Sequence, residues 1–412
     1  MAKRADLIVV GAGPGGSATA YHAARAGLSV LLLDRQEFPR DKPCGDGLMP
    51  HAAGEISLMG LGDWLDEPHH GKFSGFSMYT QTAFFREKVP PTIHGPRGYV
   101  IAREETDTRL LERARVAGAD FRSGVRATKL LRSPAGNVTG IEAVSSGETL
   151  FYEAPLVVAA DGVGGFAGEG MKAHQNAVAR RQYFRSVSGP EKDHLHVFVT
   201  KDMNELGAGY GWVFYLGDGR ANVGVGVFTK TLDRSKRNLK DYFDRFLEEP
   251  EIADWLEGAE SEGPAKSWSL KTGMWGAKRY AQGIMTVGDA ASMIHPICGE
   301  GVGYAMESGR LASAWAYEAR SRGDYSVSVL KGYERQLWRK RAKEHLSGQA
   351  FINLVPNGLF LEPLFKVCEK EPAGRLSLVE GFSGDAPIYS LLKHPRMLAK
   401  ALRDGVTQRI RS

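Results

Sequence analysis

The N-terminal segment carries the pattern that most constrains the fold. An apolar run at residues 6–10 leads directly into the turn Gly11-Ala12-Gly13-Pro14-Gly15-Gly16. Helix-forming residues 17–26 follow, and a second apolar run at residues 29–33 ends at Asp34. Strand, glycine turn, helix, strand and acid in this order form the complete fingerprint of a dinucleotide-binding βαβ unit. The segment therefore predicts a Rossmann-type α/β domain.

The residues of this fingerprint have separate physical roles. Gly11 permits the tight turn, and Gly13 lets a pyrophosphate approach the backbone. Gly16 lets the helix lie close to the strand, and Asp34 can accept hydrogen bonds from ribose hydroxyl groups. We expect these four residues to hold the adenosine half of a dinucleotide.

Two more apolar runs end in a glycine beside an aspartate. Residues 156–160 lead to Asp161-Gly162, and residues 284–287 lead to Gly288-Asp289. After the second pair, Pro296, Gly299 and Gly301 precede a run of small, helix-forming residues. Glycines allow close approach of a ligand, and free amides at a helix N-terminus favour a negative or carbonyl-rich group. These turns are therefore predicted to contribute to the same ligand site.

Strands predominate between the second and third of these turns. They are expected at residues 182–187, 194–200, 209–216 and 221–228, and the chain beyond residue 301 has mostly helical character. We predict a discontinuous cofactor domain from residues 1–75, 98–170 and 278–325. An antiparallel-sheet domain is predicted from residues 76–97 and 171–277, followed by a helical C-terminal region at residues 326–412.

Composition and charge exclude several classes of protein. The net charge of +5 resides in residues 387–412, which hold six basic residues and one acidic residue. The rest of the chain is balanced, which argues against a broad nucleic-acid-binding face. The three cysteines Cys44, Cys298 and Cys368 are widely spaced, indicating a reducing compartment and no zinc site. We expect a cytoplasmic protein whose basic, amphipathic tail contacts the inner face of a membrane, or a tail helix docked on the body.

Two further segments resemble motifs of a known family. Phe38-Pro39-Arg40-Asp41-Lys42-Pro43-Cys44-Gly45-Asp46-Gly47-Leu48 resembles the PxxKxCG segment of geranylgeranyl reductases and menaquinone side-chain reductases. Tyr210-Gly211-Trp212-Val213-Phe214-Tyr215, followed by Gly224-Val225-Gly226, resembles their YxWxFP segment, with Tyr215 in place of proline. Together with the strand-end turns, these segments resemble FAD proteins with the p-hydroxybenzoate hydroxylase fold. The resemblance implies an α/β fold: a glutathione-reductase-like (Rossmann-type) FAD-binding domain, an inserted antiparallel-sheet substrate domain and a helical C-terminal region.

The same resemblance implies one FAD, held without a covalent bond. Arg103 would reach the pyrophosphate, Asp289 would bond the ribityl chain, and the amides of Gly299 to Gly301 would face the pyrimidine edge of the flavin. The implied cofactor-binding residues are Gly11, Gly13, Pro14, Gly15, Gly16, Asp34, Arg35, Cys44, Gly45, Asp46, Arg103, Val125, Asp161, Gly162, Gly288, Asp289, Pro296, Gly299, Gly301 and Val302. The reductant is left open between NADPH and an external reduced carrier.

Candidate residues around the flavin have two interpretations each. Tyr210, Trp212 and Phe214 alternate along a strand and so share one face, either as an aromatic wall for an apolar substrate or as ordinary core packing. Cys44 is a candidate catalytic proton donor or a small residue in a tight turn. His295 is a candidate proton donor or a structural hydrogen-bonding residue.

The resemblance favours an FAD-dependent reductase that saturates carbon–carbon double bonds of an isoprenoid chain, such as a geranylgeranyl group or a prenylquinone side chain. A monooxygenase, or less readily a halogenase, is the alternative; the WxWxIP pair typical of flavin halogenases is absent. A non-catalytic prenyl-binding protein is a third possibility. The expected partner is an apolar small molecule, and the sequence leaves the oligomeric state open.

Overall fold

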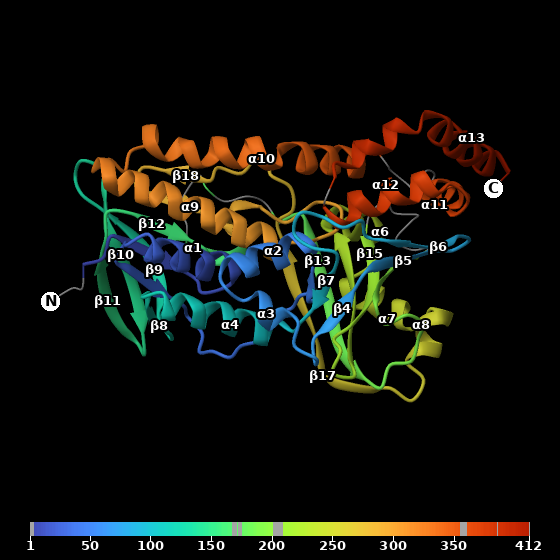
Figure 1. Ribbon diagram of the computed structural model, residues 1–412, viewed down its shortest axis with the longest axis horizontal. Helices are drawn as coiled ribbons and strands as arrows, with labels where there is room; N and C mark the ends of the chain where they lie inside the picture. The colour runs from blue at the N-terminus through green and yellow to red at the C-terminus, as the bar shows by residue number, and fades with distance from the viewer. Residues whose placement is uncertain are drawn as a thin grey trace.

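The computed structural model describes residues 4–166, 171, 175–200, 209–354, 361–384 and 386–411. Figure 1 shows two sheet layers toward opposite ends of the long axis, bridged along one side by the long helices α9 (Val302–Arg322) and α10 (Val327–Leu354). Helices α11 to α13 lie beyond α10, next to the second sheet layer. Ser412, the last residue of the expected basic tail, lies outside the described residues.

The first sheet has six strands in the order β18-β19-β12-β1-β2-β8. The strands are β1 (Leu7–Val10), β2 (Val30–Leu33), β8 (Asp120–Arg122), β12 (Val157–Ala159), β18 (Tyr280–Ala281) and β19 (Ile284–Thr286). All pairs are parallel except that of β18 with β19. Parallel pairing brings the carboxyl ends of β1, β2, β12 and β19 to one edge. Each of the predicted glycine or aspartate turns begins at that edge.

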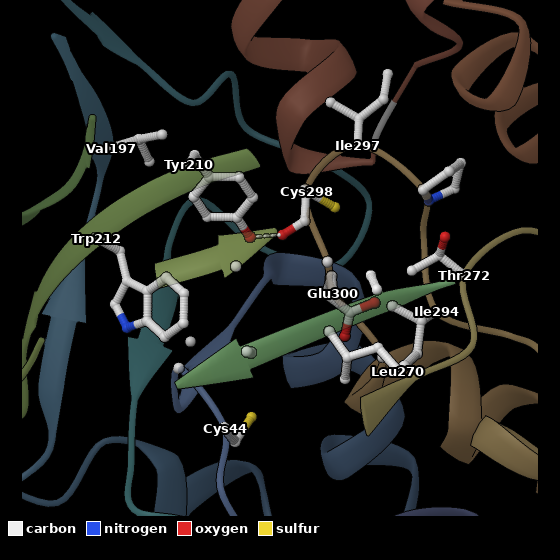
Figure 2. A pocket seen from close by; sticks show the side chains of 18 of the residues that line it. Cys44, Val197, Tyr210, Trp212, Leu270, Thr272, Ile294, Ile297, Cys298 and Glu300 are labelled. Carbon is white, nitrogen blue, oxygen red and sulfur yellow. Dashed lines mark hydrogen bonds between the residues drawn. The ribbon is translucent and has the colours of Figure 1, made fainter. Parts of the chain in front are cut away.

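The second sheet has seven strands in the order β17-β13-β16-β15-β14-β5-β6. The strands are β5 (Gly75–Thr80), β6 (Phe84–Lys88), β13 (Ala177–Arg185), β14 (His194–Val199), β15 (Gly209–Tyr215), β16 (Arg220–Phe228) and β17 (Glu260–Leu270). Among the described strands of this sheet, only β14 and β5 pair in parallel. One face packs on α7 (Leu239–Leu247) and α8 (Pro250–Trp255), and the other packs on α11 (Leu361–Lys370) and α12 (Pro372–Ser383). Strand β15 passes the loop that carries Cys298, as Figure 2 shows.

Smaller elements complete the fold. They are β3 (Gly47–Leu48), β4 (Gly71–Phe73) and β7 (Gly98–Val100) in one small sheet; β9 (Arg126–Arg132), β10 (Val138–Ser145) and β11 (Glu148–Glu153) in another; the helices α1 (Pro14–Arg25), α2 (Pro50–Leu58), α3 (Gly62–Leu65), α4 (Arg103–Val116), α6 (Thr229–Ser235) and α13 (Pro395–Arg411); and the short 3₁₀ turns η1 (Gly162–Gly164), η2 (Gly288–Ala291) and η3 (Ile388–Lys393). No helix in the described ranges is both long enough and apolar enough to cross a bilayer.

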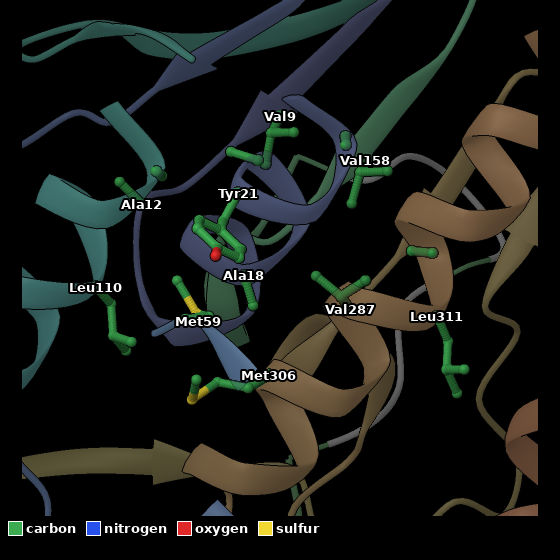
Figure 3. Close-up of a cluster of buried hydrophobic side chains, with 14 of the residues drawn as sticks. Val9, Ala12, Ala18, Tyr21, Met59, Leu110, Val158, Val287, Met306 and Leu311 are labelled. Carbon is green, nitrogen blue, oxygen red and sulfur yellow. The ribbon is translucent and has the colours of Figure 1, made fainter. Parts of the chain in front are cut away.

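The six-stranded sheet is the middle of three layers. Leu7 and Val9 of β1 point toward α1 and α9, whereas Ile8 and Val10 point toward the β9–β11 sheet. Figure 3 shows the helical side of this core, where Val9 and Val287 lie near residues of α1 and α9. A Cβ atom on Gly309 would come within 2.3 Å of the Gly15 carbonyl oxygen, so α9 lies almost directly on α1. This contact fixes the start of α9 relative to the glycine turn.

Three elements differ from the sequence-based expectation. The strand expected at residues 182–187 is β13, which begins earlier, at Ala177, and ends at Arg185. Strand β17 was not predicted, because it contains Gly263 and Pro264 and is mostly exposed at the sheet edge, where a proline is tolerated. Helix α1 begins at Pro14 rather than at Ser17, since proline is favoured in the first helical turn. The predicted domain boundaries stay a prediction.

Candidate functional site

The turn after β1 accepts only glycine at two positions. Gly11 has a φ of +100°, and a Cβ atom there would lie 2.4 Å from the Ala160 carbonyl oxygen. A Cβ atom on Gly16 would lie 1.7 Å from the Gly11 carbonyl oxygen. These contacts exclude any side chain, so the backbone at the edge of the sheet stays bare and close to the strands.

Asp34 stands at the end of β2 with its carboxylate fixed by the backbone. One oxygen accepts a hydrogen bond from the Ala12 amide at 2.7 Å, and the other accepts one from the Gln36 amide at 2.9 Å. The carboxylate therefore sits beside the glycine turn, where the fingerprint predicts a ribose.

A cavity, termed the first cavity, runs along this edge of the sheet. Predicted cofactor-binding residues that line it are Gly11, Gly13, Pro14, Gly15, Asp34, Arg35, Arg103, Val125, Asp161, Gly162, Gly288 and Asp289. Gly16 is not among them, because it packs against Gly11 instead. One oxygen of Asp161 accepts the Phe166 amide at 2.6 Å, whereas Oδ1 is buried and has no hydrogen-bond partner in the described structure. A glycine cradle with an unpaired carboxylate oxygen fits a ligand rich in hydroxyl and phosphate groups.

Basic side chains at the far end of this cavity are held by ion pairs. Arg103 donates two hydrogen bonds of 2.7 Å to the carboxylate of Asp107. Against the effect of burial, this guanidinium keeps the pKa of Asp107 below its ordinary value. Arg40 lies 3.0 Å from Asp107, and Lys42 lies 2.9 Å from Asp289. Asp107 was missed by the sequence analysis, although its spacing of four residues from Arg103 on one helix was a usable signal.

A second cavity adjoins the first, since Pro14, Lys42, Arg103 and Asp289 line both. The remaining predicted residues line this second cavity: Cys44, Gly45, Asp46, Tyr210, Trp212, Phe214, Pro296, Gly299, Gly301 and Val302. Its outer wall comes from the C-terminal helices through Phe351, Leu361, Phe365, Leu378 and Phe382. These five residues carry no recognisable motif, so the sequence analysis assigned them no role.

The aromatic residues of β15 line a cavity and also pack in the core, and their contact with a substrate stays a prediction. Tyr210, Trp212 and Phe214 line the second cavity and also pack into the core between the sheet and α11 and α12. Gly224 makes room for the indole, because a Cβ atom there would lie 2.3 Å from a ring carbon of Trp212. The Tyr210 hydroxyl donates to the Cys298 carbonyl oxygen, which ties the strand to the loop before α9 (Figure 2).

A buried hydrogen-bond network joins this strand to the Cys44 loop. The Trp212 indole donates to Oδ1 of Asn222 at 2.9 Å. The Asn222 amide donates in turn to the Cys44 carbonyl oxygen at 2.7 Å and to the Asp46 carboxylate at 2.8 Å. The Tyr183 hydroxyl also donates to Asp46, at 2.6 Å. Sequence reasoning missed Asn222, although a lone amide in an otherwise apolar strand was a visible signal.

The two predicted proton donors are placed differently. Cys44 lines the second cavity, and burial raises the pKa of its thiol against the opposing effect of Arg103, so the thiol keeps its proton. His295 does not line that cavity, and its ring stacks on Tyr304. Burial lowers the pKa of His295 to about 3, so the ring is neutral and has no acidic proton to give. The structure therefore argues against His295 as the donor.

One surface cluster bears on the expected absence of a metal site. Glu67, His69, His70 and Glu105 bring potential ligand atoms close together. The closest contact within this cluster is an ion pair, in which Nε2 of His70 lies 2.9 Å from the carboxylate of Glu105. Burial opposes protonation of His70, but Glu105 raises the pKa of that ring. The absence of a metal site stays a prediction.

Comparison with known proteins identifies the family. The model of a family described as an FAD binding domain matches residues 4–346. A menaquinone reductase from Mycolicibacterium smegmatis is 35% identical over 327 residues, covering 76% of each chain. A digeranylgeranylglycerophospholipid reductase from Methanosarcina acetivorans is 31% identical over 374 residues, covering 86% of each chain. The chain belongs to the geranylgeranyl reductase family of FAD-dependent oxidoreductases.

The fold of this reductase-family chain agrees with that assignment. A geranylgeranyl bacteriochlorophyll reductase-like protein from Thermoplasma acidophilum superimposes with a TM-score of 0.78 at 25% identity, covering 96% of this chain and 99% of the other. The first cavity meets the requirements of FAD, because it combines the bare glycine turn, Asp34 and the unpaired oxygen of Asp161. Contact of each predicted residue with FAD stays a prediction.

Proposed function

We propose that this reductase-family chain uses reduced FAD to saturate carbon–carbon double bonds of an isoprenoid chain. The observation that carries the proposal is the second cavity, which adjoins the dinucleotide cavity and is lined mainly by aromatic and aliphatic side chains. An apolar polyene fits such a lining, because it offers no polar groups for a site to bind. The similarity to a menaquinone reductase and a digeranylgeranylglycerophospholipid reductase supports the same substrate class.

The side chains around this cavity provide the groups that the proposed reaction needs in addition to FAD. When bound, FAD in its reduced form supplies a hydride to one carbon of the double bond, and a proton must reach the other carbon. Trp212 and Phe214 line the cavity wall, where aromatic rings can stabilise positive charge that develops on the alkene. Cys44 holds a protonated thiol in the same wall. The C-terminal helices add apolar side chains to the cavity wall.

An anaerobic turnover experiment tests this function. Dithionite-reduced holoenzyme, mixed with a prenylquinone or a geranylgeranyl lipid, should give a product heavier by two hydrogens for each double bond reduced. Trp212→Ala should lower the rate about a hundredfold through loss of substrate placement. A monooxygenase would instead give no anaerobic product and an oxygen-dependent gain of one oxygen atom, and that result would refute the proposal.

We further propose that the C-terminal tail contacts a membrane that holds the apolar substrate. Met397 and Ala401 of α13 are buried against the body, so the helix is docked. Leu392 and Leu402 nevertheless remain 68% and 56% exposed. They lie among the basic residues Lys393, Arg396, Lys400 and Arg403. Exposed leucines among basic residues suit the interface of an anionic membrane.

A further inference from the structure

Glu300 is a buried acid in the wall of the second cavity. It lies in the loop just before α9, lines the cavity and is only 6% exposed. Figure 2 shows its carboxyl group between Cys298 and Leu270, near Ile294. A carboxyl group in such apolar surroundings is rare unless it is paired or has a function.

Only half of the Glu300 carboxyl group is satisfied by hydrogen bonding. Oε1 accepts the Gly303 amide at 2.6 Å, in the first turn of α9. Oε2 is buried and has no hydrogen-bond partner among the described residues. A role in capping α9 would explain Oε1, which accepts the Gly303 amide. It would leave Oε2 without a role, because that amide needs only one acceptor.

Three other buried carboxyl groups of the chain are paired with cations, whereas the buried carboxyl group of Asp46 accepts hydrogen bonds from Tyr183 and Asn222. Asp107 is bonded to Arg103, Glu55 to Arg310, and Glu307 to Arg341 at 2.6 Å. Glu300 takes part in no ion pair within the described residues. Burial raises the pKa of Glu300 to about 7, whereas Arg341, despite burial, lowers the pKa of Glu307 to about 2. Glu300 thus differs from these ion-paired carboxyl groups by holding a proton near neutral pH.

Several titratable and charged groups lie around Glu300. These are His295 and Cys298 of its own loop, Tyr304 and Glu307 of α9, and Arg341, Glu344 and His345 of α10. His51 lies beside Tyr304, with a ring separation of 5.2 Å, and lines an outer cavity together with His94 and Arg341. Arg341 is bonded to His51, so these polar groups extend from the surroundings of Glu300 to the outer cavity.

We propose that the carboxyl group of Glu300 donates the proton that is added to the substrate double bond. The inference rests on the proposed function. The O–H bond of Glu300 breaks, and the π electron pair of the alkene forms a C–H bond with the released proton. The second carbon of the former double bond would then receive the hydride that reduced FAD supplies. The remaining carboxylate takes up a proton from water before the next turnover. Cys44 is the weaker acid of the two, since its thiol has a pKa above the ordinary value of about 8.5.

Glu300→Gln is the decisive variant. The glutamine carbonyl can still accept the Gly303 amide and has the same shape, but the side chain cannot donate an acidic proton. FAD affinity should stay unchanged, and anaerobic formation of saturated product should fall by about 10²- to 10⁴-fold. Glu318→Gln, at a partly exposed position on the helix α9 that follows Glu300, is the matched control and should keep the wild-type rate. Cys44→Ser should keep more activity than Glu300→Gln.

An infrared titration gives a readout independent of turnover. Wild-type protein should show the carbonyl band of a buried, protonated carboxyl group that disappears as pH rises through about 7, and Glu300→Gln should lack that band. Wild-type turnover in Glu300→Gln, or absence of the band at pH 6, would overturn the inference and leave the proposed function standing. A wild-type protein that reduces no prenyl substrate would refute the proposed function, and this inference would fall with it.

Discussion

The ammonium group of Lys42 lies 2.9 Å from the carboxylate of Asp289, where the first and second cavities meet. The pair joins the loop that follows β2 to the turn that follows β19, two segments far apart in the sequence. Both side chains are largely buried, at 22% and 12% exposure, so the pair is shielded from solvent more than a surface ion pair is. The junction therefore carries balanced charge, in contrast to the unpaired Glu300 nearby.

Asp34→Ala should weaken FAD binding. The substitution removes the acceptor that the fingerprint assigns to the ribose and frees the Ala12 amide. Loss of a hydrogen bond to a charged group predicts a cost of about 1–3 kcal/mol, or roughly 5- to 150-fold in the dissociation constant. Quenching of flavin fluorescence during titration measures this constant, with the exposed Glu112→Ala as control. Equal affinities for the two variants would contradict the assigned role.

Gly224→Ala should destabilise the protein, whereas Gly226→Ala on the same strand should not. A Cβ atom at position 224 would lie 2.3 Å from the Trp212 ring, but at position 226 the nearest ring atom is 3.7 Å away. Overpacking of this kind costs about 1–3 kcal/mol. Urea unfolding of the two variants side by side measures the difference. Similar midpoints for both variants would show that the Trp212 ring moves aside freely.

The sequence predicted most of the parts of the site but not how they are joined. Local patterns sufficed for the glycine turns, for Asp34 and for the alternating aromatic residues of β15, because each depends on neighbours in the chain. Asn222 was missed, since its role depends on Cys44 and Asp46, which are distant in sequence. His295 was given a possible catalytic role because its loop borders the site, and only the three-dimensional structure shows that its ring lies behind the cavity wall.

The basic tail should bind anionic membranes through charge. Replacing Lys393, Arg396, Lys400 and Arg403 by glutamine removes four cations near the exposed Leu392 and Leu402. At about 1 kcal/mol for each basic residue near an anionic surface, affinity should fall by on the order of a hundredfold or more. Flotation with anionic vesicles measures recovery, and neutral vesicles are the control. Equal flotation of the variant and the wild type would refute a membrane role for the tail.

The unfolding free energy should depend on pH through Glu300. Burial raises the pKa of this group in the folded state from 4.5 to about 7, so the native state binds more protons than the unfolded state within that window. Its contribution to stability is therefore complete below pH 4.5 and is lost as pH rises through about 7. The loss between pH 5 and pH 8 should amount to about 2–3 kcal/mol. Urea unfolding without FAD tests this by subtracting the values for Glu300→Gln from those for the wild type, because other titrating groups cancel in the difference. A difference that does not change between the two pH values would show that Glu300 is ionised in the folded protein.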